Sequence, residues 1–221
     1  MRAAKIIFVL LLVAPHALDA FAYVPLPRPQ RVVDRIVARI EDDIILQSQV
    51  RELGAYQQLI DGQAESDDKL LKELIEQWVV ATEADASHFP QPAQFEVDRE
   101  MARLVSQFPN IETYQARLRE LGLSDNQVRQ LLIRQIYDER YVDYKFRPSV
   151  QVQTADIETY YKQEFLPELT KKNQPAPAMS SVEEEIRELL VQRGISSLTS
   201  KWLDDTKSRL KIEIETPNGN P

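Results

Sequence analysis

The sequence predicts a mostly α-helical protein that carries one small β-sheet. Glycine is scarce, at 5 of 221 residues, and the chain is rich in Glu, Gln, Leu and Arg, a composition that favours helix over sheet. Apolar residues recur at helical spacing over most of the chain, whereas a period of two marks residues 32–40 and 210–214. Because a lone strand leaves its backbone groups unpaired, we expect these two distant strands to pair.

The N-terminus has the features of a secretory signal peptide, which we expect to span residues 1–22. Arg2 and Lys5 precede an apolar run that is short for a bilayer span, and Ala20-Phe21-Ala22 offers a small-x-small cleavage pattern after either alanine. An uncleaved membrane anchor is the alternative. Removing residues 1–22, which carry a net charge of +1, changes the formal charge from −8 to −9. Residues 23–30 contain three prolines and are predicted to form an extended leader.

A β-hairpin is predicted next, with strands over residues 32–40 and 44–46. Glu41, Asp42 and Asp43 lie between these strands. Three carboxylates raise the possibility of a metal site, but a hard-cation loop needs converging oxygen ligands and a glycine at its bend. The spacing here lacks both, and aspartate is a common turn residue. We therefore predict a solvated hairpin tip, with no metal and no cofactor.

Five helices are predicted between the hairpin and Pro148 from apolar spacing and end signals. The first is capped by Ser48 and reaches about residue 60, and the second covers residues 67–84 after a cap at Ser66. The third covers residues 93–107, and the fourth covers residues 111–121 between a cap at Asn110 and an end at Gly122. The fifth and longest covers residues 125–146 and begins with a Ser124–Gln127 capping box.

The last third of the chain repeats this pattern with different end signals. Thr154 is expected to cap a helix that ends near Pro167, and the stretch "TKKNQPAPAMSS", residues 170–181, is expected to form a polar, proline-containing connector. Ser181 is expected to open a capping box with Glu184 before a helix over about residues 182–208. The strand containing Leu210, Ile212 and Ile214 follows, and residues 217–221 are predicted to be disordered.

The order of these elements resembles the N-terminal domain of SurA-like periplasmic chaperones over about residues 31–216. The resemblance rests on "VVDRIVARIEDDIIL", on "LGLSDNQVRQLLIRQI" with Arg129, Leu132, Arg134 and Ile136, and on "SVEEEIRELLVQRGISSLTSKWLDDTKSRLKIEIE" with its Trp202-Leu203 pair. It implies a helical domain at 31–148 that is completed by residues 180–216. In that family a parvulin isomerase domain follows the piece that "VQTADIETYYKQE" resembles, but residues 149–179 leave no room for it, and its motifs are absent.

The resemblance implies an ATP-independent periplasmic chaperone that holds or helps to fold non-native outer-membrane or secreted polypeptides and is not an enzyme. An isomerase-family member with lost or degenerate activity and an adaptor of an envelope complex are the alternatives. The acidic charge argues against nucleic-acid binding, the lack of cysteine excludes thiol chemistry, and no Walker-type glycine loop is present. No membrane span is expected after signal cleavage, and the oligomeric state is open.

An aromatic cluster provides the candidate client-binding residues. Five of the eight tyrosines belong to it, and Tyr137, Tyr141 and Tyr144 share one helical face by their spacing. They either pack against the following helix or form a partly exposed surface for extended polypeptides, to which tyrosine is suited. The full candidate set is Tyr137, Tyr141, Tyr144, Phe146, Tyr160 and Tyr161. No catalytic residue is predicted. His88 is expected to be an exposed loop residue, and Trp78 and Trp202 are expected in the core.

Overall fold

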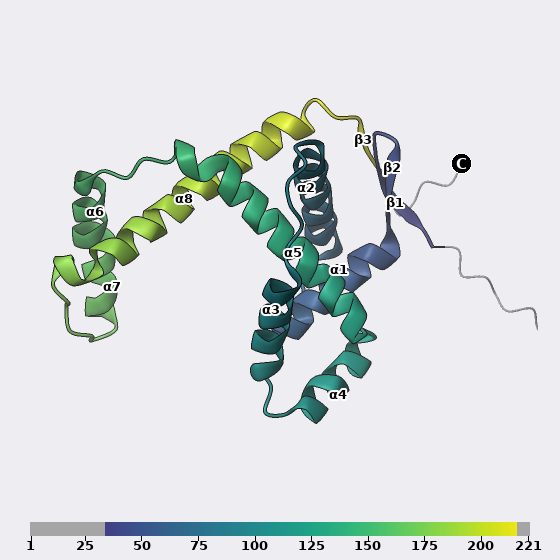
Figure 1. Ribbon diagram of the computed structural model, residues 1–221, viewed down its shortest axis with the longest axis horizontal. Helices are drawn as coiled ribbons and strands as arrows, with labels where there is room; N and C mark the ends of the chain where they lie inside the picture. Colours follow the sequence, from purple (N-terminus) through teal and green to yellow (C-terminus); the bar gives the residue numbers. More distant parts are fainter. Residues whose placement is uncertain (1–33, 216–221) are drawn as a thin grey trace, which may run out of the picture. The chain divides into compact units, whose positions relative to one another are not determined.

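The computed structural model describes residues 34–215, so the expected signal peptide, leader and C-terminal tail lie outside the described residues. The described chain is mostly helical with a small antiparallel sheet, as predicted (Figure 1). Its elements are β1 (Ile36–Ile40), β2 (Asp43–Leu46), α1 (Gln47–Ile60), α2 (Asp67–Ala86), α3 (Gln94–Ser106), α4 (Ile111–Leu121), α5 (Asp125–Phe146), a 3-10 turn η1 (Arg147–Ser149), α6 (Thr154–Tyr160), a π turn η2 (Tyr161–Phe165), α7 (Leu166–Lys171), α8 (Met179–Lys207) and β3 (Ile212–Ile214).

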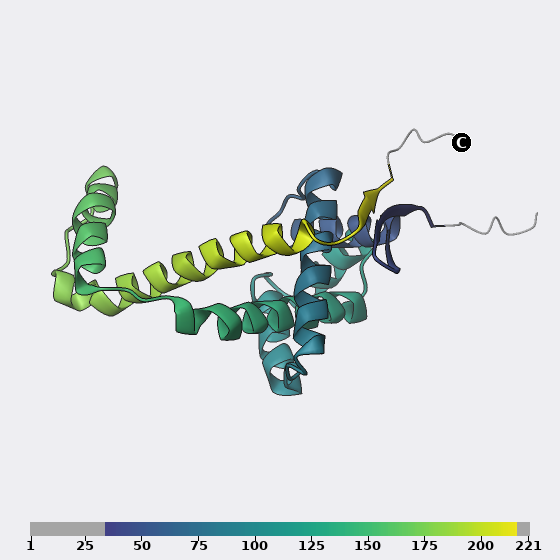
Figure 2. The same cartoon turned by 90° about the horizontal axis from the view of Figure 1, so that it is seen from above.

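The sheet joins two distant parts of the chain, as the sequence predicts. Its strand order is β2-β1-β3, and both pairs are antiparallel. Ala38 faces Ile214 and Ile40 faces Ile212. The α8–β3 segment therefore returns to β1 after the whole helical part of the chain (Figure 2).

The acids between the first two strands hold neighbouring elements in place. Glu41, at φ +49°, donates its N–H to the Lys211 carbonyl at 3.0 Å, and its carboxylate accepts the Lys211 N–H at 2.8 Å. Asp43 accepts the indole N–H of Trp78 at 2.9 Å. No cluster of three or more potential ligands for a metal ion occurs within residues 34–215. The tip is thus a hairpin turn whose acids contact β3 and α2.

Several predicted helix ends are confirmed. The Asn110 side chain accepts the Thr113 N–H at 2.8 Å, and Gly122 ends α4 with a left-handed φ of +69°. Ser124 and Gln127 form the predicted capping box, and α5 has the predicted bounds.

Three other predicted caps are wrong, because each residue lies inside its helix. The α1 helix begins before Ser48, since the Gln49 side chain accepts the Leu46 N–H at 2.8 Å. Likewise, Asp156 accepts the Gln153 N–H at 2.8 Å, which starts α6 at Thr154 itself. In α8 the Ser181 hydroxyl donates to the Ala178 carbonyl at 2.7 Å and does not accept a backbone N–H at the start of the helix.

Two helix lengths also differ from the prediction. Pro167 does not end its helix, which runs on to Lys171 after the π turn. There the Leu166 N–H bonds to the carbonyl of Tyr161, five residues back, and this wider turn makes room next to a proline that a regular helix would exclude. Among the helices of residues 34–215, α8 is the longest, with 29 residues, whereas α5 has 22.

The apolar core falls into four clusters that follow the chain. One lies under the sheet against α1 and α2, a second joins α1, α3, α4 and α5, a third joins α2, α5 and α8, and a fourth joins α6 and α8. The third contains Leu203, so α8 packs on the N-terminal helices as expected. The segment after α5 approaches α8 closely at Gly194, where an added Cβ would lie 2.6 Å from Val150.

Within residues 34–215, none of the helices combines the length and the apolar character that crossing a bilayer requires.

Candidate functional site

The three tyrosines of α5 do not form one surface, which corrects that part of the client-binding prediction. Tyr137 and Tyr141 are 5% and 3% exposed, whereas Tyr144 is 66% exposed. The two buried rings pack with Val79, Val80 and Ala84 of α2 and Leu203 of α8. Their main partner is thus an earlier helix and not only a following one.

The buried pair, Tyr137 and Tyr141, packs against the ring of Phe89. The Tyr137 hydroxyl donates to Asp85 at 2.7 Å. Burial is the main reason that the pKa of Tyr137 is raised to about 12, with the bond to Asp85 next in importance. The hydroxyl therefore remains a protonated donor throughout the physiological range.

The ring of Phe89 contacts both this buried pair and the exposed Tyr144. Its ring centroid lies 5.4 Å from the centroids of Tyr141 and Tyr144 and 5.7 Å from that of Tyr137. The end of α2 aims the ring: His88 takes a left-handed φ of +57°, and the Phe89 N–H bonds to the Ala84 carbonyl at 3.0 Å, which is a Schellman ending. His88 is exposed, as expected, and its role is in the turn.

The other three predicted residues lie elsewhere. Phe146 is half-buried, 5.7 Å from the ring of Trp202, and the Lys145 ammonium lies 5.0 Å from that indole. Trp78 and Trp202 are half-buried at the margins of the core.

Tyr160 and Tyr161 belong to the separate α6–α8 cluster. The Tyr161 hydroxyl donates to the Pro177 carbonyl at 2.6 Å, and the Arg193 guanidinium lies 4.9 Å from the Tyr160 ring. The six candidate residues therefore occupy four places in the fold: the buried pair Tyr137 and Tyr141, the exposed Tyr144, Phe146 beside Trp202, and the α6–α8 cluster.

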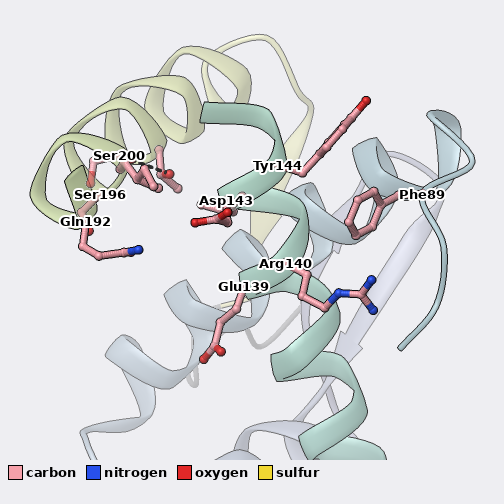
Figure 3. Close-up of a pocket in the computed structure, with 11 residues that line it drawn as sticks. Phe89, Glu139, Arg140, Asp143, Tyr144, Gln192, Ser196 and Ser200 are labelled. Atoms are coloured by element: carbon pink, nitrogen blue, oxygen red, sulfur yellow. Dashed lines mark hydrogen bonds between the residues drawn. The ribbon is translucent and has the colours of Figure 1, made fainter. Parts of the chain in front are cut away.

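The exposed tyrosine stands at an open groove of about 890 Å³. As Figure 3 shows, α5 runs between the two walls of the groove: α8 with Gln192, Ser196 and Ser200 lies on one side, and Phe89 with Tyr144 lies on the other, with Tyr144 directed away from α8. The α8 wall is mostly hydroxyl and amide, and the full lining is Phe89, Glu139, Arg140, Val142, Asp143, Tyr144, Gln192, Ile195, Ser196, Thr199 and Ser200. One wall thus offers aromatic area and the other offers hydrogen-bonding groups.

Ion pairs fix both sides of the groove. Arg147 donates to both carboxylate oxygens of Glu188, at 2.9 and 2.8 Å, and also binds Asp143, which ties α5 to α8. The hydrogen bonds from Arg147 lower the pKa of Glu188 to about 2. On the aromatic side, Arg140 lies 5.7 Å from the Phe89 ring and bonds to Glu96 at 3.2 Å.

A second cavity, of about 360 Å³, lies between α1, α2 and α5 and was not foreseen from the sequence. Its lining includes Glu73 and Asp138, and burial raises the pKa of both carboxyls, that of Asp138 to about 7. One oxygen of Asp138 is buried without a hydrogen-bond partner. The sequence signal was an acid seven residues after Leu131, on the same helical face.

Sequence reasoning also missed Phe89, which sits among chain breakers in "HFPQP". An aromatic residue in such a loop carries no periodic signal that would place it in a packed cluster.

No model of a known protein family matches the chain, and comparison with curated proteins finds none of similar sequence. The resemblance to SurA-like chaperones thus remains an interpretation of the sequence, and a functional proposal has to rest on the groove.

Proposed function

We propose that this protein is an ATP-independent periplasmic chaperone that holds non-native polypeptides in the α5–α8 groove. The observation that carries the proposal is Tyr144, which is 66% exposed at the groove and stands on the packed ring of Phe89. A single exposed aromatic residue is ordinary, but this one is rigidly supported at the edge of a groove large enough for several side chains.

The chemistry of the groove suits a client of unspecified sequence. Aromatic area at Tyr144 and Phe89 attracts apolar side chains. The hydroxyl and amide groups of Gln192, Ser196 and Thr199 on the α8 side can bond to a peptide backbone, which every client has. This combination supports extended, unfolded polypeptides as ligands and offers no constellation for catalysis.

The expected affinity is modest, because release has no nucleotide cycle to drive it. A micromolar Kd corresponds to about −8 kcal/mol, and a few aromatic contacts of roughly 1 kcal/mol each supply part of it. The formal charge of −9 expected after signal cleavage disfavours acidic clients.

The test is suppression of aggregation of an unfolded outer-membrane protein, with Tyr144→Ser as the variant. Phe95→Ser is a matched control, because Phe95 is 68% exposed and lies outside the groove lining. We expect Tyr144→Ser to lose most of the suppression while Phe95→Ser keeps it. Equal suppression by both variants would reject the groove as the client site.

The two alternatives give different results. A prolyl-peptide isomerisation assay on the purified protein is expected to give no activity, and measurable turnover would favour the isomerase alternative. Recovery of one stoichiometric envelope protein, with no suppression of client aggregation, would favour an adaptor.

A further inference from the structure

The outer edge of β3 presents backbone groups that its own sheet does not use. The Glu41 N–H donates to the Lys211 carbonyl at 3.0 Å, and the Glu215 N–H donates to the Val37 carbonyl at 2.9 Å. Odd-numbered residues of this segment therefore direct their backbone groups at β1. By alternation, the N–H and C=O of Ile212 and Ile214 point away from it. The strand order leaves this edge without a further strand in the described part of the chain.

An apolar groove runs beside the same edge. Its volume is about 380 Å³, and Leu71 and Ile75 of α2 line it together with Ile212 and Ile214. Ile214 is 59% exposed. Alternate residues of a strand lie about 7 Å apart on one face, so two such side chains of an added strand fit over this groove.

One carboxylate at the rim is available for a basic partner. Lys207 is held by Glu76 at 2.7 Å, and Lys72 lies 3.8 Å from the same carboxylate. Asp68, also in the lining, forms no ion pair within residues 34–215. Asp68 is thus the lining carboxylate that can pair with a lysine or arginine of a partner, beside the two lysines that share Glu76.

We propose that the edge of β3 binds an extended segment of a client by strand addition, with apolar residues at alternate positions over the groove and a basic residue near Asp68. The inference rests on the proposed function and deepens it, because it names β-forming segments as the preferred clients. Strand addition gives affinity through main-chain bonds and selectivity through alternate side chains. A second copy of this chain, which would pair its own β3 with this edge, is the alternative occupant that the sedimentation measurement distinguishes.

The experiment is a fluorescence-anisotropy titration of the purified full-length protein with a ten-residue peptide of alternating valine and threonine that carries one lysine. A second peptide has the same sequence but N-methyl groups on alternate residues, which block pairing on one edge. We expect the methylated peptide to bind about tenfold more weakly or worse, equivalent to roughly 1.4 kcal/mol.

Two variants of Ile214 separate the contribution of its backbone N–H to peptide binding from that of its side chain. Ile214→Pro removes an outward N–H while sparing the bonds to β1, as proline does at sheet edges, and Ile214→Thr keeps the N–H but shortens the apolar side chain. We expect both to weaken binding. The matched control is Ile44→Thr on the opposite edge strand, where Ile44 is 45% exposed; it should bind as wild type does.

Equal binding of the two peptides, or unchanged binding by both Ile214 variants, would overturn the proposal. So would a dimer in sedimentation that Ile214→Pro dissolves, because a second copy would then occupy the edge. Failure of the proposed function can be distinguished from failure of the edge proposal. If Tyr144→Ser loses client protection while the Ile214 variants keep it and no peptide binds, the groove proposal stands and the edge proposal falls. If client aggregation is not suppressed at all, yet the unmethylated peptide binds more tightly than the methylated one, the edge proposal stands and the groove proposal falls.

Discussion

Two of the cavities beside α5 differ in how their polar groups are satisfied. The α5–α8 groove is open, with one aromatic wall and one wall of hydroxyl and amide groups that solvent or a peptide can satisfy. The cavity between α1, α2 and α5 is smaller and encloses Asp138, one oxygen of which is buried and unpaired. Because an unpaired buried charge costs stability, the cavity affects folding, whereas the groove has a surface suited to binding.

The largest expected effect comes from removing a buried ring that contacts Phe89 of the groove. Tyr141→Ala removes a ring that is 3% exposed between α2, α5 and α8, and should lower the free energy of unfolding by about 4 kcal/mol. Tyr144→Ala, one turn further on and exposed, should change it by less than about 0.5 kcal/mol.

Urea denaturation followed by circular dichroism measures both variants. Similar losses of stability in the two would mean that Tyr144 is part of the core, and the groove would lose its binding wall.

A smaller effect concerns the enclosed carboxyl. Burial raises the pKa of Asp138 from 3.8 to about 7, so the native state favours the protonated form. The stabilising contribution is complete below the unfolded pKa of 3.8 and is lost as the pH rises through 7. Asp138→Asn should remove this dependence and make the protein more stable at pH 8 by about 2 kcal/mol, after allowing for residual solvent contact.

Melting temperatures at pH 5 and pH 8 measure this effect, with Asp143→Asn as a control on the groove side of the same helix. An Asp138→Asn variant whose stability changes with pH as steeply as wild type would show that Asp138 ionises normally.

The sheet could be predicted from the sequence because its signal is local. The strand at residues 210–214 has no neighbouring strand in the sequence and needs a partner, and Ile214 does pair with Ala38 of β1. Asn110 and Ser124 were predictable for the same reason, since a cap acts within three residues. Ser48 failed as a cap because the Gln49 side chain bonds to the Leu46 N–H, and Ser181 failed because its hydroxyl donates to the Ala178 carbonyl inside α8.

The groove could be predicted only in part. Spacing shows that Tyr137, Tyr141 and Tyr144 share a helical face, but it does not reveal which neighbour covers that face or where the cover ends. Here α2 ends at Ala86 and the chain turns at His88, so the cover stops before Tyr144. That boundary depends on the crossing of α2, α5 and α8, which no local pattern records.

Photocrosslinking tests the central claim most directly. A photoreactive phenylalanine analogue is placed at Ser196 in the groove wall, and at Ser180, an exposed residue of α8 outside the groove lining. Each protein is irradiated with an unfolded outer-membrane protein. The account predicts strong crosslinks from position 196, reduced by Tyr144→Ser, and weak crosslinks from position 180. Equal crosslinking from both positions would contradict it.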